Sequence, residues 1–268
     1  MKGRILIVAG SDSGGGAGIQ ADIKTVTALG GYAMTALTAV TVQDTTGVHG
    51  IHNIPADFVA EQMRVVINDI GVDCVKIGML HRPEIIRVVA QVLDMYDEKI
   101  PLVVDPVMVA KGGSPLISEG AINSLKKNII PKANILTPNM PEARALSESD
   151  IDIEDGKEKF AADLLSLGSA AILVKGGHGD GDTVEDIFVS GSSAPETFSS
   201  PRIQSLNTHG TGCTLASAIS IGLGQGMELR AAIVRARKFV NLAIRKAPNF
   251  GKGQGPLNHM HSINSFDE

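Results

Sequence analysis

Near its N-terminus the chain reads Ile5-Leu6-Ile7-Val8-Ala9 and continues as Gly10-Ser11-Asp12-Ser13-Gly14-Gly15-Gly16-Ala17-Gly18. The apolar run predicts a strand buried on both faces, and the spacing of apolar residues after the loop predicts a helix. A plain strand-to-helix turn rarely needs five glycines in nine residues, whereas backbone that approaches a ligand closely does. We therefore interpret residues 10–18 as a ligand loop. Their spacing does not match the G-x-G-x-x-G fingerprint of dinucleotide-binding proteins, and the P-loop sequence G-x-x-x-x-G-K-[ST] occurs nowhere in the chain.

Beyond this loop, short β-branched runs alternate with longer helical stretches. This alternation predicts βαβ units and an α/β fold built on a mainly parallel sheet. Strands are expected at Ile5–Ala9, Ala33–Val42, Cys74–Ile77, Leu102–Val104, Asn134–Leu136 and Ala171–Val174. Helices are expected at Ala17–Leu29, Ala56–Ile70, Pro83–Met95, Ser118–Asn128, Pro141–Leu146, Glu158–Leu167, Thr211–Gly224 and Glu228–Ala247.

One segment breaks this rhythm. The chain from His178 to Pro201 is rich in Gly, Asp and Ser, with short strand candidates at Thr183–Val189 and Thr197–Ser199. This pattern predicts an antiparallel hairpin at the edge of the sheet. The acidic stretch Glu148–Asp155 is expected to be a solvated connection between helices. Because the 268 residues contain no internal repeat or convincing linker, we expect a single domain over residues 1–268.

The composition excludes several classes of function. A formal net charge of −5 provides no basic field for nucleic acid or anionic lipid, and 3% aromatic residues without Trp make base-stacking surfaces improbable. No apolar run approaches the roughly 20 residues that span a bilayer, and no signal-peptide pattern follows Met1. Cys74 and Cys213 cannot form a disulfide framework or a closed cysteine zinc site. We therefore expect a cytoplasmic protein with neither nucleic-acid nor membrane partners.

Polar residues follow several of the expected strands. In open α/β sheets, ligands bind beyond the carboxyl ends of the strands. Asp105 ends one strand, and Asn139 and Glu142 follow another, where such groups suit Mg²⁺ held mostly through water. Glu142 could instead be a helix-start residue that complements the helix dipole. Lys175, at the end of a further strand, could place a cation against phosphate, so the strand ends together indicate phosphate chemistry.

A second glycine motif stands near the C-terminus, where Asn207-Thr208-His209-Gly210-Thr211-Gly212-Cys213-Thr214 leads into an apolar helix. Glycines and hydroxyl residues at a helix start form an anion nest that can hold a transferring phosphoryl group. Cys213 falls in the first helical turn, where the dipole favours a thiolate, although a lone cysteine is more often a small buried thiol. His209 and Cys213 lie four residues apart, but two ligands alone make a poor metal site.

These motifs, in this order, resemble the ribokinase superfamily and, within it, the hydroxymethylpyrimidine/phosphomethylpyrimidine kinases of thiamine biosynthesis. The resemblance extends over nearly the whole chain and rests on Ala9–Asp22, Lys76–Leu80, Val104–Met108, Thr137–Ala143, Lys175–His178, Thr208–Thr214 and Gly251–Pro256. It implies a ribokinase-like three-layer fold, with a central mostly parallel sheet flanked by helices, a small edge hairpin and no large lid. It also implies a homodimer.

The resemblance implies an enzyme that uses ATP and Mg²⁺ to phosphorylate 4-amino-5-hydroxymethyl-2-methylpyrimidine and then its monophosphate. It places the pyrimidine pocket at Gly10, Ala17, Asp22, Gln43, Met79 and Val107. It places ATP against Lys175, Gly176, Thr208, Lys238 and Asn139, although Lys238 could equally be a solvated helix residue. Asp105 and Glu142 are the expected Mg²⁺ ligands, and Gly210, Thr211, Gly212 and Cys213 the catalytic group.

Gln43 is the residue that points most directly to the substrate. An amide offers both a donor and an acceptor to the amino group and ring nitrogen of a pyrimidine, whereas related pyridoxal kinases are expected to carry an apolar residue there. Pyridoxal kinase is nevertheless the alternative activity, and a non-catalytic nucleotide-binding regulator and a thiol oxidoreductase are further alternatives. Most superfamily kinases have an Asp base where this chain has Cys213, so we expect the Cys213 thiolate to take the proton from the substrate hydroxyl.

Overall fold

The computed structural model describes residues 2–96, 100–109, 116–147, 157–177, 179, 181–191 and 193–263. Within them, nine strands form one sheet in the order β3-β2-β1-β4-β5-β6-β7-β8-β9. The strands from β2 to β7 in this order are parallel, and β3, β8 and β9 are antiparallel additions at the two edges. They are β1 (Arg4–Asp12), β2 (Tyr32–Gln43), β3 (Val48–Asn53), β4 (Cys74–Ile77), β5 (Leu102–Val104), β6 (Ile135–Leu136), β7 (Ala171–Val174), β8 (Thr183–Ser190) and β9 (Glu196–Pro201).

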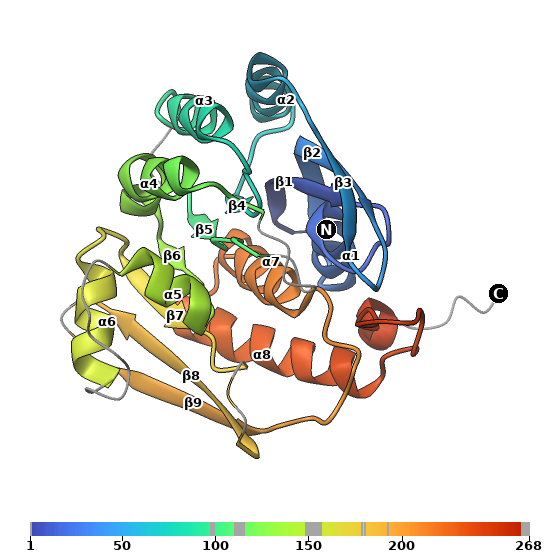
Figure 1. Cartoon of the computed structure of the whole chain (residues 1–268). Coiled ribbons are helices and arrows are strands. Elements are labelled where there is room, and N and C mark those ends of the chain that lie inside the picture. Colours follow the sequence, from blue (N-terminus) through green and yellow to red (C-terminus); the bar gives the residue numbers. More distant parts are fainter. Residues whose placement is uncertain are drawn as a thin grey trace.

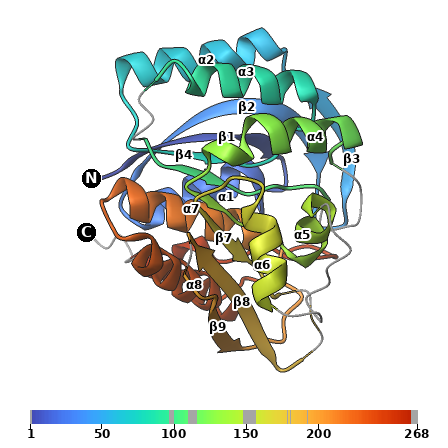
Figure 2. The same ribbon diagram turned by 90° about the vertical axis from the view of Figure 1, so that its left-hand side faces the viewer.

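Helices cover both faces of the sheet (Figures 1 and 2). One layer contains α2 (Ala56–Asp69), α3 (Pro83–Leu93), α4 (Glu119–Asn128), α5 (Met140–Leu146) and α6 (Lys157–Leu165). The other contains α1 (Gly18–Ala28), α7 (Thr211–Gly224) and α8 (Leu229–Arg245). Two 3-10 turns, η1 (Ile130–Lys132) and η3 (His259–Ser262), complete the described elements.

Strand β1 shows why the sheet lies between two helical layers. Its side chains alternate, so Leu6 and Val8 join the core under α2 and α3 while Ile5 and Ile7 join the core under α7 and α8. All four are fully buried. Continuous apolar sequence therefore produces a strand that is covered on both faces, as predicted.

The prediction of an α/β fold with a mostly parallel central sheet is confirmed, and β8 and β9 confirm the antiparallel edge hairpin. His178 and the acidic stretch 148–155 lie outside the described residues. Strand β3 was not predicted, because its sequence is short and only Val48 and Ile51 of its six residues are β-branched, with Gly, His and Asn at the other positions. It pairs with β2 after a tight turn in which Asp44 N–H donates to Gly47 O and Asp44 Oδ1 accepts from Thr46 N–H.

The parallel strands bring their carboxyl ends to one edge, and the N-terminus of α7 meets the same edge (Figure 1). No helix among the described residues is both long and apolar enough to cross a membrane.

Candidate active site

The two glycine motifs contact each other, although nearly two hundred residues separate them. Gly210 adopts a left-handed φ of +84°, and a Cβ there would overlap the carbonyl oxygen of Gly16. A Cβ on Gly16 would in turn overlap the ring of His209. Glycine is therefore required on both sides of this contact. The contact places the helix-start motif directly against the first glycine loop.

Asp12 organises the first glycine loop. Its carboxylate accepts hydrogen bonds from the backbone N–H groups of Gly14, Gly16 and Ala17 at 2.8, 3.1 and 2.8 Å, and His209 Nε2 lies 2.8 Å from Asp12 Oδ2. Burial raises the pKa of Asp12, but the hydrogen bonds from His209 and the loop amides outweigh burial and hold this pKa below its usual value. The amides of Gly14, Gly16 and Ala17 therefore bind an internal carboxylate, while Gly10, Ala17 and Gly18 of the same loop border the cavity.

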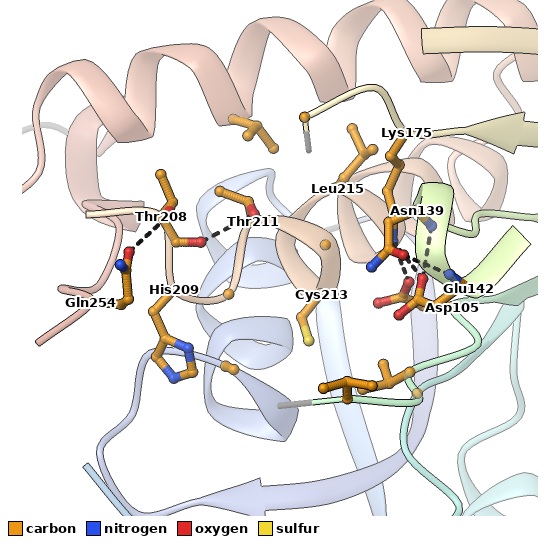
Figure 3. A pocket seen from close by; sticks show the side chains of 18 of the residues that line it. Asp105, Asn139, Glu142, Lys175, Thr208, His209, Thr211, Cys213, Leu215 and Gln254 are labelled. Carbon is orange, nitrogen blue, oxygen red and sulfur yellow. Dashed lines mark hydrogen bonds and ion pairs between the residues drawn. The ribbon is translucent and has the colours of Figure 1, made fainter. Parts of the chain in front are cut away.

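The second motif forms the start of α7. Gly210 is the N-cap residue, and the Thr211 hydroxyl donates to Thr208 O at 3.1 Å. The following N–H groups of Gly212 and Cys213 precede the hydrogen bonding of the helix itself, so they can receive an anion. Figure 3 shows Cys213 between this turn and the strand ends on the opposite side of the cavity.

The charged part of the site lies at the ends of β5, β6 and β7 (Figure 3). Lys175 Nζ lies 2.7 Å from Asp105 Oδ1 and 3.7 Å from Glu142 Oε2. Burial lowers the pKa of Lys175, but the two carboxylates outweigh burial and raise it, so the lysine is a cation. Burial raises the pKa of Glu142, although Lys175 opposes that change. The cluster thus contains two carboxylates and one ammonium group at the phosphate-handling edge.

These features line one cavity of about 880 Å³, a volume in the range of small-molecule sites. Fourteen of the predicted site residues border it: Gly10, Ala17, Gln43, Met79, Asp105, Val107, Asn139, Glu142, Lys175, Thr208, Gly210, Thr211, Gly212 and Cys213.

Comparison with known proteins identifies what this cavity belongs to. Residues 12–258 match the family described as phosphomethylpyrimidine kinase. The chain belongs to the phosphomethylpyrimidine kinase family.

Two relatives illustrate how far this kinase family matches the chain. Over 255 residues the chain is 44% identical to the hydroxymethylpyrimidine/phosphomethylpyrimidine kinase of Streptomyces coelicolor, covering 95% of this chain and 93% of that protein. It is also 52% identical over 260 residues to a thiamine biosynthesis bifunctional protein of Geobacter sulfurreducens. That match covers 97% of this chain and 52% of the relative, so the chain spans about half the length of the bifunctional protein.

A solved structure supports the same fold. The pyridoxal kinase of Staphylococcus aureus in complex with AMP-PCP and pyridoxal superimposes on this chain with a TM-score of 0.88 at 33% identity, covering 100% of this chain and 96% of that one. The ribokinase-like fold and the kinase class predicted from the sequence are therefore confirmed.

Within this kinase, the expectation of a lowered pKa at Cys213 is wrong. Burial raises the pKa of the Cys213 thiol to about 12, nearby Asp22 and Asp105 act in the same direction, and Lys76 opposes them. Desolvation of the ionised form thus outweighs the helix N-terminus. Cys213 is therefore a thiol at neutral pH.

Asp22 does not border the cavity of the kinase, contrary to prediction. Its side chain is fully buried behind the cavity wall, where Lys76 Nζ lies 2.9 Å from Oδ2 and Ser217 Oγ donates to Oδ1 at 2.7 Å. A charge pair this deep is satisfied internally. Its partner Lys76 borders the cavity instead.

Two predicted ATP contacts also lie outside the cavity of the kinase. Gly176 N–H donates to Asp186 Oδ1 at 2.9 Å, and a Cβ at Gly176 would overlap a carbonyl oxygen of β8. Its role is close backbone packing, and Gly177 borders the cavity instead. Lys238 is exposed on α8, and the preceding residue Arg237 faces the cavity and pairs with Asp186 at 2.7 Å. The alternative of a solvated Lys238 is thus confirmed.

Several residues that border the cavity of the kinase had no predicted substrate role. Asp12 and His209 stood inside the two motifs, yet only the folded chain brings their side chains into contact. Gln254, in the glycine-rich C-terminal segment, borders the cavity and accepts from the Thr208 hydroxyl at 3.1 Å (Figure 3). The only sequence feature that pointed to Gln254 was that its segment, Gly251–Pro256, belongs to the family resemblance.

Proposed function

We propose that this enzyme uses ATP to phosphorylate the hydroxymethyl group of 4-amino-5-hydroxymethyl-2-methylpyrimidine and then phosphorylates the monophosphate to the pyrophosphate. The observation that carries the proposal is that one cavity contains an amide suited to an aminopyrimidine, Gln43, together with the anion nest and the Lys175 cluster. Membership of the phosphomethylpyrimidine kinase family supports the same activity.

The pyrimidine is expected to lie beside β2 and the first glycine loop. Gln43 can accept from the amino group and donate to a ring nitrogen. Met79, Val107 and Ala17 provide apolar contacts for the ring, and Cβ-free Gly10 lets the Met79 side chain pack against β1. The hydroxymethyl group then faces Cys213, which borders the same cavity.

Phosphoryl transfer depends mainly on positioning and on neutralising charge. We assign the N–H groups of Gly212 and Cys213 to the oxygens of the transferred phosphoryl group, and Lys175 to a phosphate of ATP. Lys175 already pairs with the carboxylates of Asp105 and Glu142. A phosphate of ATP would be a further anionic partner for it. Thr208 and Asn139 border the cavity on either side. The Asn139 NH₂ group can donate to another phosphate oxygen, and the Thr208 hydroxyl can do so by exchanging its hydrogen bond to Gln254.

A magnesium ion fits the carboxylates of this cluster. The described residues contain no group of three or more His, Cys, Asp or Glu side chains that could hold a metal alone. Mg²⁺ in kinases, however, is commonly bound by one or two carboxylates, water and the phosphates of the substrate. Asp105 and Glu142 would be those ligands, and the ion would neutralise phosphate charge.

We assign Cys213 the role of general base in its ionised form. Because the thiol has a pKa of about 12, roughly one molecule in a hundred thousand carries the thiolate at neutral pH. In that form the sulfur takes the hydroxyl proton as the new O–P bond forms and the bond to ADP breaks. The second phosphorylation uses an acceptor that is already an anion and needs no base.

A nucleotide-consumption assay tests the proposed function. Hydroxymethylpyrimidine, its monophosphate and pyridoxal are supplied side by side with ATP and Mg²⁺, and we expect turnover of the first two and a kcat/KM for pyridoxal at least about tenfold lower. Turnover of pyridoxal in preference to both pyrimidines would show the alternative activity. Binding of ATP without turnover of any acceptor would show a nucleotide-binding regulator.

The single domain, the homodimer and the cytoplasmic location stay predictions. One continuous sheet from β1 to β9 supports the single domain. Light scattering coupled to gel filtration measures the oligomeric state, and a monomer at micromolar concentration would contradict the dimer.

A further inference from the structure

His209 lies where four segments that border the cavity come together. Its ring packs on Gly16 of the first glycine loop, and its Nε2 lies 2.8 Å from Asp12 Oδ2 and 3.4 Å from Gln43 Nε2. Its backbone N–H donates to Gly255 O in the C-terminal segment at 3.1 Å. The side chain is only 9% exposed. A single imidazole thus contacts both the loop carboxylate and the amide expected to bind the substrate.

The proton on His209 Nε2 is fixed by Asp12. The Asp12 carboxylate has a lowered pKa and is ionised, so it offers acceptors only. Three loop amides already donate to it. A bare ring nitrogen 2.8 Å from this carboxylate would oppose two acceptors. His209 Nε2 therefore carries a proton and donates it to Asp12.

A protonated His209 Nε2 determines which end of the Gln43 amide can face it. An NH₂ group 3.4 Å away would oppose two donors, whereas an amide oxygen in that place can share the Nε2 proton as the longer arm of a bifurcated hydrogen bond. The other end of the amide gives the same answer, because Thr41 Oγ1 donates its one proton to Ser11 O at 2.8 Å. The Thr41 hydroxyl, 3.1 Å from the Gln43 amide, can then only accept, and it requires the NH₂ group.

We propose that His209 is a positioning residue that fixes the Gln43 amide with its oxygen toward His209 and its NH₂ group toward Thr41, and so determines how the acceptor substrate is oriented. The substrate part of this proposal rests on the proposed function. In this orientation the Gln43 oxygen, which accepts, lies on the side of the α7 nest, and the Gln43 NH₂ group, which donates, lies on the side of β2. The exocyclic amino group of the pyrimidine then lies on the His209 side and the ring nitrogen on the Thr41 side.

NMR tests the orientation without any assay of activity. In the uniformly labelled wild-type enzyme without ligand, we expect a directly bonded proton on His209 Nε2 and NOEs from the Gln43 NH₂ protons to the Thr41 methyl group. NOEs from those NH₂ protons to the ring protons of His209, with none to Thr41, would overturn the proposal. An unprotonated Nε2 would also overturn it.

A matched pair of substitutions tests the positioning role. His209→Gln keeps an N–H donor at the same number of bonds from Cβ, whereas His209→Met keeps the length and removes the donor. We expect His209→Met to raise KM for hydroxymethylpyrimidine by about tenfold or more, while its KM for ATP stays within about threefold of wild type. In His209→Gln, KM for hydroxymethylpyrimidine should also stay within about threefold of wild type. Equal increases of both KM values in His209→Met would show a general structural role and contradict the proposal.

A double-mutant cycle shows whether His209 acts through Gln43. In a Gln43→Met background, adding His209→Met should change KM for the pyrimidine by less than about twofold, because the amide it positions is already absent. Additive losses would contradict action through Gln43. His52→Met on β3 serves as a control for histidine replacement, since His52 is exposed and away from the cavity. If the wild-type enzyme phosphorylates no pyrimidine, the proposed function fails, while the NMR result still decides the orientation.

Discussion

Cys213 borders the cavity at the start of α7, and burial keeps its thiol protonated. If its rare thiolate is the base, the rate of the first phosphorylation follows the ionised fraction, which rises tenfold per pH unit below the pKa of about 12. We therefore expect kcat/KM for hydroxymethylpyrimidine to rise steadily from pH 6 to pH 9 without a plateau. The rate of the second phosphorylation should show no such slope.

The matched control for this pH profile is Cys213→Ser, in which the slope should disappear and the first step should fall by about 10²-fold or more. The second step should fall far less. A flat profile in the wild type, or equal losses of both steps in Cys213→Ser, would show that the thiol only positions the hydroxyl. Alkylation by iodoacetamide provides an independent reading of the same ionisation, and it should accelerate with pH over the same range.

Gly210 offers a second prediction at the level of one residue. Gly210→Ala would introduce both a left-handed alanine and an overlap with Gly16 O, which would push the α7 nest away from the first glycine loop. We expect kcat/KM to fall by about 10²-fold or more, because misplacement of a catalytic group by about 1 Å has such an effect. Steady-state kinetics under saturating ATP measures the loss.

Gly226 provides the matched control for Gly210. It has a φ of +82° and open space where a Cβ would be, and it follows the C-terminal end of α7. Gly226→Ala should lower stability by about 1–2 kcal/mol through the left-handed backbone alone and leave kcat/KM unchanged. Similar kinetics in both variants would mean that the contact between the loops does not position the nest.

Single residues also show where sequence reasoning reached its limit. The motifs placed Gln43, Cys213 and Lys175 at the cavity correctly, because the end of a strand and the start of a helix fix the position of a side chain. The prediction for Lys238 was wrong because successive side chains on a helix point about 100° apart around its axis, and it is the neighbouring Arg237 that faces the cavity. The prediction for Asp22 was wrong because a sequence motif does not show how deeply a side chain is buried. Here the carboxylate pairs with the buried Lys76.

At the scale of elements, α5 separates two roles that the sequence left open for Glu142. The helix begins with a capping box, in which Asn139 Oδ1 accepts from Glu142 N–H at 2.9 Å and Glu142 Oε2 accepts from Asn139 N–H at 2.7 Å. Glu142→Gln preserves an acceptor for the cap but removes the charge. We expect this variant to need about tenfold more Mg²⁺ for half-maximal activity, with little change in thermal stability.

Asn139→Ala is the complementary change in α5, because it removes a helix cap and leaves the Glu142 carboxylate in place. It should lower the free energy of unfolding by about 1 kcal/mol while the Mg²⁺ requirement stays within about twofold. Magnesium titrations at fixed ATP and denaturant unfolding together measure both effects. If Glu142→Gln instead loses stability and keeps its Mg²⁺ response, Glu142 is a capping residue only.

Elements were predictable to the extent that their stability is local. Strands covered on both faces and helices with an apolar face appear as runs and periods in the sequence, and nearly all of them were found. Strand β3 depends on pairing with β2 and on the turn at Asp44, so its own residues do not identify it. The short turns η1 and η3 likewise follow from packing against neighbouring helices.

Across the whole molecule, the cavity unites segments from both ends of the chain. Asp12 contacts His209, and Thr45 accepts from the backbone N–H groups of Lys252 and Gly253 in the C-terminal segment. The resemblance assigned residues of both glycine motifs to one active site, but it did not identify which side chains join them. Such contacts arise only when the fold is complete, because no periodicity encodes a partner two hundred residues away.

The same C-terminal region predicts how stability depends on pH. His259 in η3 is buried against α7, with Nε2 at 2.9 Å from Thr214 Oγ1, and burial lowers its pKa from 6.5 to about 4. Between these values the unfolded chain binds a proton that the folded protein does not, so stability falls as pH drops from 6.5 to 4. The full loss of stability from this residue is about 3 kcal/mol.

Denaturant unfolding at intervals of half a pH unit measures this loss of stability at His259. In His259→Gln the slope in this window should be shallower, since glutamine does not titrate, whereas His52→Gln on β3 should retain the wild-type slope. Identical slopes in the wild type and in His259→Gln would mean that His259 is protonated in the folded protein, which its contact with Thr214 and its burial do not favour.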